Sequence, residues 1–222
     1  HTLPLDKVRI IPHGNYDGVY AAIPRKEARS ALLLDEEQTV ALLPGQIRAY
    51  KTPSALLDAF LDVAGRNDRL ILAGHRASDV GNLTIPDDPR IITKFGFLPN
   101  EDIALVYAAA DFVVLPYAES LTSGSAILAH SLGRGVLGSD TAGLRDAVLV
   151  PSTGTLFDHR KPRALADALR TALAEGPEPW AIRGKAGARA SRARDWTVLG
   201  AAWRSLYNEL GCLPRSARVH TS

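Results

Sequence analysis

The feature of this sequence that most constrains its fold is a regular alternation of short apolar runs with amphipathic helical patterns. The apolar runs are continuous, as in strands buried on both faces, and they predict strands at 40–43, 69–73, 90–93, 112–115, 135–138 and 155–157. Helical patterns lie before, between and after these strands, at 26–34, 54–64, 100–110, 122–132 and 164–174. In the 100–110 pattern, Asn100 is the expected N-cap and Tyr107 belongs to the apolar stripe. Strand and helix alternate about five times, which predicts an α/β fold: a Rossmann-like doubly wound parallel sheet covered by helices on both faces.

The two ends of the chain depart from this alternation. Residues 7–11 form a further short strand pattern. The chain begins at His1 and contains no methionine, so we expect a fragment whose upstream part is missing. Residues 198–210 carry a strong amphipathic stripe that predicts a C-terminal helical extension. Residues 213–222 are expected to form a disordered tail.

A row of basic residues precedes the amphipathic stripe. Lys185, Arg189 and Arg192 recur at helical spacing beside a row of alanines. Such a row can contact a membrane surface or an acidic partner, or it can be a solvated helix face. Because alanine offers little apolar area for membrane binding, the sequence favours the solvated face and keeps a peripheral membrane contact as the alternative.

Composition excludes several classes of protein. The 222-residue chain has a formal net charge of +2, so it carries no strong field for nucleic acid. No apolar run in the sequence approaches the roughly 20 residues that span a bilayer. Cys212 is the one cysteine of the chain, which excludes an internal disulfide framework and favours a reducing, cytoplasmic compartment.

The segment "GQIRAYK" at residues 45–51 has the features of an anion site. It follows an apolar strand pattern and precedes an amphipathic helix, and it places Arg48 and Lys51 three positions apart after Gly45. Backbone N–H groups and the positive end of the helix dipole favour negative charge there, and the two cations can close over a phosphate. Cations near a strand end are more often merely solvated, so the segment alone is a weak signal.

A second loop of this kind, "PYAESLTSGS" at residues 116–125, follows the 112–115 strand and opens a helix. Thr122 or Ser123 can cap that helix, and Gly124 lets a ligand approach the backbone closely. Ligands of parallel sheets bind beyond the carboxyl ends of the strands, so both loops face the same edge. Together they can hold a diphosphate and its attached group, whereas the second loop by itself could be an ordinary helix cap.

The order of the motifs "GQIRAYK", "RLILAGH", "FGFLPNEDIALVYAAADFVVLPY" and "SLTSGSAILAHSLGRGVLGSD" resembles the C-terminal half of a GT-B glycosyltransferase of the GT4 type. The resemblance runs from about Val8 to Leu210 and is most specific between Asp102 and Asp140. It implies one half of a GT-B fold, in which this half binds a nucleotide-sugar and a separate N-terminal domain binds the acceptor. It also implies that no divalent metal is needed, and the sequence has no obvious metal-ligand spacing of histidines and carboxylates.

The resemblance implies a division of the chain into four parts. Residues 1–38 would be an inter-domain segment, and residues 39–180 the nucleotide-sugar-binding Rossmann-like domain. Residues 181–212 would be helices that pack back toward the missing N-terminal domain, ahead of the tail at 213–222.

The resemblance also assigns roles to single residues. Arg48 and Lys51 match the cation pair that holds the donor diphosphate and stabilises the charge that builds on the leaving group. Glu119 is the acidic candidate in the neighbouring loop. The residues expected to bind the nucleotide-sugar are Gly45, His75, Phe97, Leu98, Ser123, Gly124 and Ser125. A lone histidine is more often structural than functional, and a structural role is the alternative for His75. His13 could be structural or face the inter-domain cleft.

One position departs from the family pattern. The family commonly has two glutamates about eight positions apart, the second of which holds the ribose hydroxyls. Leu128 stands at that second position and cannot accept a hydrogen bond, while Ser120 takes the first place, one position after Glu119. Either the ribose has another contact in this chain, or donor binding is weakened or lost.

The leading expectation is the nucleotide-sugar-binding domain of a retaining, metal-independent glycosyltransferase. Its donor would be a UDP- or GDP-linked sugar, it would need no other cofactor, and it would be inactive without its N-terminal domain. One alternative is a non-catalytic glycosyltransferase-like module that binds a partner, which Leu128 favours. Another is a GT-B fold epimerase acting on a nucleotide-sugar, for which Glu119 is the one good acid/base candidate.

Overall fold

The structure is a computed structural model that describes residue 4 and residues 8–212. Within these residues, six parallel strands form one sheet in the order β3-β2-β1-β4-β5-β6. The strands are β1 Thr39–Pro44, β2 Asp68–Gly74, β3 Ile91–Phe95, β4 Phe112–Leu115, β5 Gly135–Ser139 and β6 Gly154–Phe157. The strand order reverses between β1 and β4, which confirms the doubly wound sheet that the alternation predicts.

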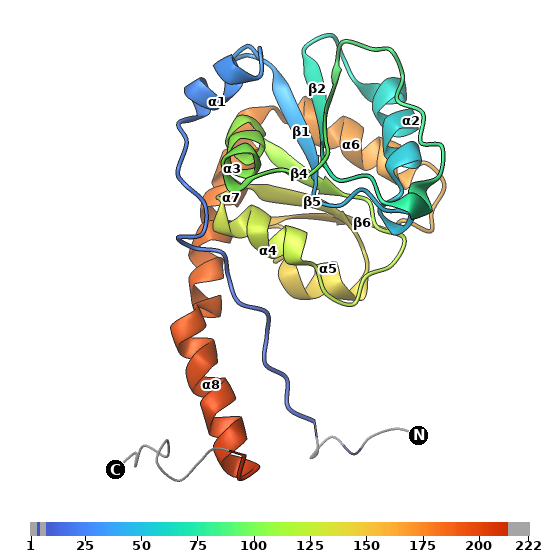
Figure 1. The fold of residues 1–222 in the computed structure, drawn as a ribbon. Helices are drawn as coiled ribbons and strands as arrows, with labels where there is room; N and C mark the ends of the chain where they lie inside the picture. The colour runs from blue at the N-terminus through green and yellow to red at the C-terminus, as the bar shows by residue number, and fades with distance from the viewer. Residues whose placement is uncertain (1–3, 5–7, 213–222) are drawn as a thin grey trace.

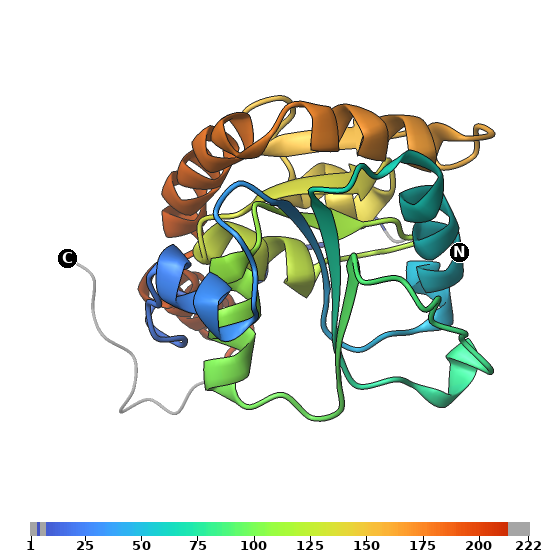
Figure 2. The same cartoon turned by 90° about the horizontal axis from the view of Figure 1, so that it is seen from above.

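Helices cover both faces of this sheet (Figure 1 and Figure 2). The α-helices are α1 Arg25–Ala31, α2 Pro53–Val63, α3 Asn100–Ala109, α4 Gly124–Ser131, α5 Ala142–Ala147, α6 Ala164–Ala174, α7 Pro177–Ser191 and α8 Trp196–Glu209. Short 3-10 turns occur at η2 Ala49–Lys51, η3 Ser78–Val80 and η4 Arg192–Arg194.

The period of two along each strand divides the core into two layers. In β1, Val40 and Leu42 join the layer formed with α1, α3 and α4, whereas Ala41 and Leu43 join the layer formed with α2 and α6. Every residue of β1 is buried. A strand that buries both faces must be apolar throughout, which is why the continuous runs predicted the sheet correctly.

A buried ion pair fixes the amino ends of β1 and β4. Asp111 is 3% exposed and Arg29 of α1 is fully buried, with Arg29 Nη2 2.9 Å from Asp111 Oδ2. The same carboxylate oxygen accepts from the backbone N–H of Val40 at 2.7 Å, and the other oxygen pairs with Arg25 at 2.5 Å. Arg29 also donates to the backbone carbonyls of Ala109, Asp35, Glu36 and Gln38. Hydrogen bonds to both ions offset the cost of burying them.

Helix α1 belongs to the segment that the sequence analysis set between domains. In the structure its buried Ala28, and Leu32 that follows it, pack into the same core layer as α3. This part of the inter-domain segment is therefore held on the sheet domain.

Two local expectations were wrong. Within the described part of the 7–11 pattern, residues 8–11 form no strand, and Ile10 is 89% exposed. An apolar run without a neighbouring strand cannot complete a ladder of hydrogen bonds; Lys7 lies outside the described residues. Asn100 is not the N-cap of α3 but its first residue, because Pro99 occupies the cap position. Ser123 does cap α4, and its Oγ accepts from the N–H of Ala126 at 3.2 Å.

The C-terminal helices extend beyond the sheet layers. Helix α7 packs on β5 and α4, and α8 then projects away from the sheet (Figure 1). Of the apolar residues in α8, Leu199 is buried, whereas Trp196, Val198, Trp203 and Tyr207 are between 41% and 59% exposed. The amphipathic stripe therefore forms the predicted helix but finds few partners within the described residues. The expected tail at 213–222 lies outside those residues.

Two further observations concern the surface. The basic row of Lys185, Arg189 and Arg192 is exposed, as a solvated helix face would be. In the part of the chain that the structure describes, no helix combines the length and apolarity that crossing a membrane requires.

Replacing Asp111 with alanine should destabilise the domain by about 3–5 kcal/mol, because Arg29 would keep its charge in the core without a counter-ion. Urea denaturation with a constant m-value measures the effect. The matched control is Asp62→Ala, which breaks the exposed pair with Arg163 and should cost no more than about 1 kcal/mol. Equal losses in the two variants would contradict the structural role of Asp111.

Candidate functional site

The loops after β1 and β4 are bound to each other at the point where the strand order reverses. The backbone N–H of Ala118 donates to the carbonyl of Tyr50 at 2.8 Å. Thr52 Oγ1 donates to the carbonyl of Pro116 at 2.5 Å. These contacts place the "GQIRAYK" and "PYAESLTSGS" loops side by side, as the shared sheet edge predicts.

The loop after β2 is attached to the same region. The N–H of Ile47 donates to the carbonyl of His75 at 2.8 Å, and the N–H of Ala77 donates to the carbonyl of Ile47 at 2.9 Å. Ile47 is fully buried and anchors its loop, so the residues on either side of it are held at fixed positions along the sheet edge.

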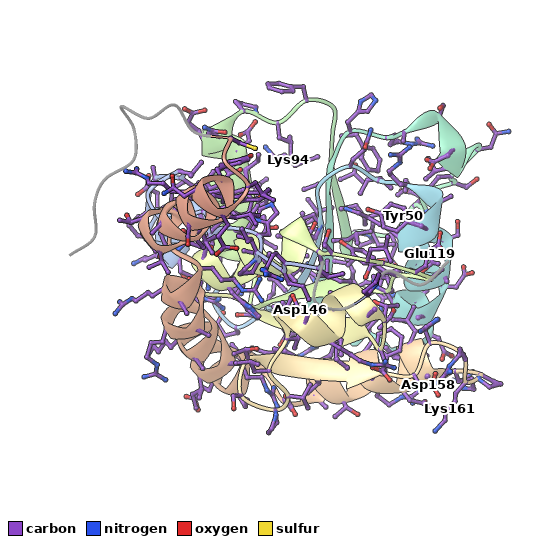
Figure 3. All side chains as sticks on the ribbon, turned by 90° about the horizontal axis from the view of Figure 1, so that it is seen from below. Tyr50, Lys94, Glu119, Asp146, Asp158 and Lys161 are labelled. Carbon is purple, nitrogen blue, oxygen red and sulfur yellow. The ribbon has the colours of Figure 1, made fainter. Side chains whose placement is uncertain are left out.

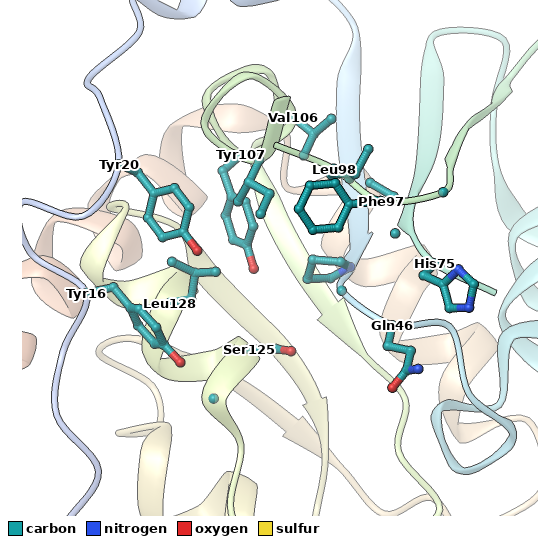
Figure 4. Close-up of a pocket in the computed structure, with 17 residues that line it drawn as sticks. Tyr16, Tyr20, Gln46, His75, Phe97, Leu98, Val106, Tyr107, Ser125 and Leu128 are labelled. Carbon is teal, nitrogen blue, oxygen red and sulfur yellow. The ribbon is translucent and has the colours of Figure 1, made fainter. Parts of the chain in front are cut away.

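These loops and helices α3 and α4 enclose a pocket of about 480 Å³ at the carboxyl ends of β1 and β2 (Figure 4). Part of the wall comes from the segment before α1, through Tyr16 and Tyr20. The other lining residues are Pro44, Gly45, Gln46, Ala73, Gly74, His75, Gly96, Phe97, Leu98, Ile103, Val106, Tyr107, Gly124, Ser125 and Leu128. None of these described lining residues is an aspartate, glutamate, lysine or arginine.

Two glycines form the floor of the pocket where β1 and β2 end. Gly45 and Gly74 have φ angles of +79° and +141°, which L-residues with a side chain rarely adopt. A methyl group on Gly74 would lie 2.0 Å from the carbonyl oxygen of Gly45, so the two strand ends can approach this closely only as glycines. Gly45, a predicted site residue, is therefore one of two glycines that this close approach of β1 and β2 requires.

Lys51 brings a positive charge beneath this floor. A methyl group built at Gly45 would lie 3.3 Å from Lys51 Nζ and 3.7 Å from Ser125 Oγ, so the two polar groups flank the same small space. Lys51 is 3% exposed, and its Nζ donates to the carbonyl of Pro44 at 2.9 Å. It also lies 5.6 Å from the ring centroid of Tyr117. An ammonium ion has three donors, so this one can still donate to an anion.

Burial, and then the nearby Arg48, lower the pKa of Lys51 from 10.5 to about 8. Both effects disfavour the charged form, because the ammonium loses hydration and faces a like charge. An anion bound beside Gly45 would counteract the effect of Arg48 and raise the pKa of Lys51 again. Such a perturbed lysine in a crevice is a candidate binding or catalytic group.

Arg48 lies outside the pocket wall. Its side chain is 46% exposed, and Nε is 3.3 Å from Asp79 Oδ2 in η3. Arg48 and Lys51, predicted as one pair of cations, therefore have different surroundings. Lys51 lies beneath the pocket, and Arg48 lies at its outer edge in a salt bridge.

The remaining predicted site residues divide into two groups. Those that line the pocket are Gly45, His75, Phe97, Leu98, Gly124 and Ser125. Ser123 is buried as the cap of α4, one residue before the pocket wall. Glu119 is exposed and is not a lining residue; it lies on the surface near Tyr50 (Figure 3).

Sequence reasoning missed the tyrosines of the wall. Tyr107 was placed in the apolar stripe of the 100–110 helix, where it is indeed 2% exposed, but it also faces the pocket. Tyr16 and Tyr20 lie in a segment without periodicity. Leu128, the residue that departs from the family pattern, lies in the wall beside them.

His13 lies at the junction of the leading segment with α8. Its ring centroid is 5.6 Å from that of Tyr16 and 6.3 Å from that of Trp196. The indole N–H of Trp196 donates to the carbonyl of Asn15 at 2.9 Å. His13 thus contributes to this aromatic contact and does not line the pocket.

A second pocket of about 480 Å³ lies on the other side of the β4–α4 loop, between α2 and the loop before α6. It contains Asp58, Asp62, Lys161 and Arg163. Asp62 and Arg163 already neutralise each other at 2.7 Å. The pocket at the strand-order reversal is the better candidate, because a helix N-terminus and Lys51 converge there.

Comparison with known proteins gives a consistent result. Residues 38–175, more than half of the chain, match the model of the family described as glycosyl transferases group 1. The D-inositol 3-phosphate glycosyltransferase of Mycobacterium bovis (strain BCG / Pasteur 1173P2) is 31% identical over 204 residues, which are 86% of this chain and 42% of that protein. The chain spans less than half of the length of the curated relatives it matches.

Solved structures share the fold at low sequence identity. Anabaena Alr3699/HepE, crystallised in complex with UDP-glucose, has a TM-score of 0.74 at 18% identity, covering 88% of this chain and 56% of that one. The C-terminal domain of a glycosyl transferase group 1 family protein (LpcC) from Francisella tularensis has a TM-score of 0.62 at 15% identity, covering 79% of this chain and 94% of that one.

The lowered pKa of Lys51 gives a prediction for stability. The unfolded chain has the ordinary lysine pKa of 10.5, so between about pH 8 and 10.5 it binds more protons than the folded chain. Stability therefore rises with pH through this window. Lys51→Met should abolish that rise and stabilise the chain at pH 7 by up to about 3 kcal/mol.

Urea denaturation at pH 7.5 and 9.5 measures this effect, with the exposed Lys161→Met as the matched control. If the two variants respond to pH in the same way as the unsubstituted chain, Lys51 does not titrate as the structure indicates.

Proposed function

Because this chain belongs to the group 1 glycosyltransferase family, we propose that it is the donor-binding domain of a retaining, metal-independent glycosyltransferase. The proposal depends above all on one observation. Lys51 Nζ, Ser125 Oγ and the N-terminus of α4 converge around Gly45 at the strand-order reversal. This arrangement suits the diphosphate of a nucleotide-sugar.

The electrostatics of this point favour a diphosphate over a neutral ligand. Gly124 and Ser125 begin α4, so their backbone N–H groups stand at the helix N-terminus, and the helix dipole adds partial positive charge there. Lys51 supplies a positive charge from a side chain that is almost fully buried. When the bond from sugar to phosphate breaks, negative charge grows on the leaving diphosphate, and these fixed groups stabilise it.

Protein groups would thus perform the role that a metal ion has in other transferases. Arg48 is the second cation, and it can turn from Asp79 to the diphosphate because both side chains are partly exposed. Among the described residues, no three His, Cys, Asp or Glu side chains are grouped so that they could hold a metal ion.

The rest of the pocket suits a nucleoside. Its volume of about 480 Å³ lies within the ordinary range for small-molecule sites. His75, Phe97 and Leu98 follow β2 and β3 and line the same pocket as Ser125 at the helix N-terminus, and they would contact the base. The likeness to HepE, whose structure contains UDP-glucose, supports UDP as the nucleotide, with GDP as the alternative to be tested.

The acceptor and the transfer step would require a further domain. The curated relatives are more than twice as long as the matched part of this chain. The exposed aromatic residues of α8, Trp203 and Tyr207, would pack against that domain. We therefore expect this chain alone to bind a nucleotide diphosphate without transferring sugar. The free, exposed thiol of Cys212 fits a reducing cytoplasm.

A non-catalytic partner-binding module is the second candidate, because Leu128 in the wall provides no hydrogen bond to a ribose. The buried charge of Lys51 argues against it. A charge that destabilises the fold has no evident use in a module without an anionic ligand. Epimerase chemistry receives no support, since Glu119 lies outside the pocket.

Calorimetric titration with UDP and GDP tests the proposal. The unsubstituted chain should bind at least one of them, and Lys51→Ala should weaken binding about ten- to hundred-fold, the usual value of a hydrogen bond between charged groups. Affinity should also fall as the pH rises from 7.5 to 9, since Lys51 loses its proton near pH 8. Lys161→Ala is the control for general charge effects. Absence of heat with both nucleotides in a folded sample would refute donor binding.

Asp79 should compete with the diphosphate for Arg48. Asp79→Asn removes the counter-charge at 3.3 Å and should increase the affinity for UDP by about two- to five-fold, the value of an exposed ion pair. Asp62→Asn breaks a comparable surface pair away from the pocket and should leave affinity unchanged. A weaker affinity in Asp79→Asn would mean that Arg48 acts from its present position.

A further inference from the structure

The hydroxyl group of Tyr107 is a polar group without a partner in the wall of the pocket. The residue is 2% exposed, and its hydroxyl oxygen is buried and makes no hydrogen bond within the protein. Buried hydroxyls in native proteins almost always have a partner, so one that lacks it indicates a missing water or ligand. The place of Tyr107 beside a pocket makes a ligand the relevant possibility.

Tyr107 is oriented toward the ligand space. It projects from α3, and its hydroxyl points between Ser125 and Leu128 into the pocket (Figure 4). Tyr20, in the segment before α1, directs its own hydroxyl toward the same end of the pocket (Figure 4). This end of the pocket therefore combines an apolar surface, Leu128, with neutral hydroxyl groups.

The chemistry of this end restricts what can bind there. The described lining residues include no carboxylate that could hold a sugar hydroxyl and no arginine or lysine that could hold a further phosphate. Burial raises the pKa of Tyr107 well above its ordinary value, so the hydroxyl stays protonated. A neutral phenol can both donate to and accept from an alcohol. An uncharged hydroxyl group is therefore a partner that can use both the donor and the acceptor capacity of this phenol.

The distance of Tyr107 from the diphosphate region indicates which hydroxyl group of a nucleotide it can reach. Ser125 and Leu128 are three positions apart on one face of α4, which is a rise of about 4.5 Å along the helix. Tyr107 stands beside Leu128 and thus about one sugar ring away from the helix N-terminus. The base-contacting residues His75 and Phe97 lie farther along the pocket (Figure 4).

We propose that Tyr107 binds a ribose hydroxyl of the nucleotide, so that a phenol on α3 provides the contact that Leu128 cannot. The proposal rests on the proposed function, because it requires a nucleoside diphosphate in this pocket. Small shifts of Leu128 and Tyr20, which are both only partly buried, bring the ligand to the phenol.

The test is a comparison of Tyr107→Phe with the unsubstituted chain by calorimetry, using UDP, 2′-deoxy-UDP, 3′-deoxy-UDP and pyrophosphate. Tyr107→Phe should weaken UDP binding about ten-fold and leave pyrophosphate binding unchanged, since pyrophosphate has no ribose. One of the two deoxy nucleotides should bind the unsubstituted chain about ten-fold more weakly than UDP does. That deoxy nucleotide should bind Tyr107→Phe as tightly as it binds the unsubstituted chain, because it already lacks the hydroxyl group that Tyr107 would bind.

Two controls make the outcome decisive. Tyr207→Phe removes a hydroxyl from α8, outside the pocket, and should change no affinity. Urea denaturation of Tyr107→Phe should show a stability equal to or above that of the unsubstituted chain, since its hydroxyl has no partner in the protein. If the unsubstituted chain binds no UDP, the proposed function fails. If the unsubstituted chain binds UDP and Tyr107→Phe binds UDP equally well, the role of Tyr107 is refuted. It is also refuted if Tyr107→Phe weakens the binding of both deoxy nucleotides by the same factor.

Discussion

The contact between β1 and β4 is the constraint on which the rest of this molecule depends. It joins the two halves of the sheet, and its register covers only two residue pairs, Ala41 with Phe112 and Leu42 with Val113. At the amino ends, the Asp111 carboxylate holds the strands together through Val40 and Arg29. At the carboxyl ends, the chain leaves β1 and β4 in loops that separate and then reconnect through Thr52 and Pro116. The short pairing of β1 with β4, together with the contacts at its two ends, creates the crevice in which a ligand can lie.

That crevice contains buried polar groups whose cost to the fold the proposed nucleotide would offset. Lys51 is charged although it is buried, and the hydroxyl of Tyr107 is buried without a hydrogen bond. At the opposite edge, the buried charge of Arg29 is satisfied within the protein: it donates to four backbone carbonyls in addition to its carboxylate. This contrast between Arg29 at one edge of the sheet and Lys51 at the other is what the proposed function leads us to expect, since groups that serve binding need not stabilise the fold.

The sheet was predictable from the sequence because strands buried on both faces leave little freedom in residue type. The 112–115 and 164–174 elements were predicted with the bounds that the structure gives. The contacts of Arg48 were not predictable, since a long charged side chain at a surface can select any nearby partner, here Asp79 of a turn with no sequence signal. Tyr107 was read as core because a residue can be both buried in a helix stripe and adjacent to a cavity. Residues 8–11 show that a short apolar run predicts a strand only where a neighbouring strand can receive it.

The unusual state of Lys51 also affects how this protein can be labelled. With a pKa of about 8, about a tenth of its amines are neutral at pH 7, whereas an ordinary lysine with a pKa of 10.5 is almost entirely protonated. Neutral amines are the nucleophilic form, so Lys51 is chemically distinct from the exposed lysines of the same chain. Only a reagent small enough to enter beside Gly45 can reach it. A compact aldehyde followed by mild reduction near pH 7 would therefore label Lys51 more readily than its burial alone would allow, and protection of that one position would report occupancy of the crevice without any measurement of turnover.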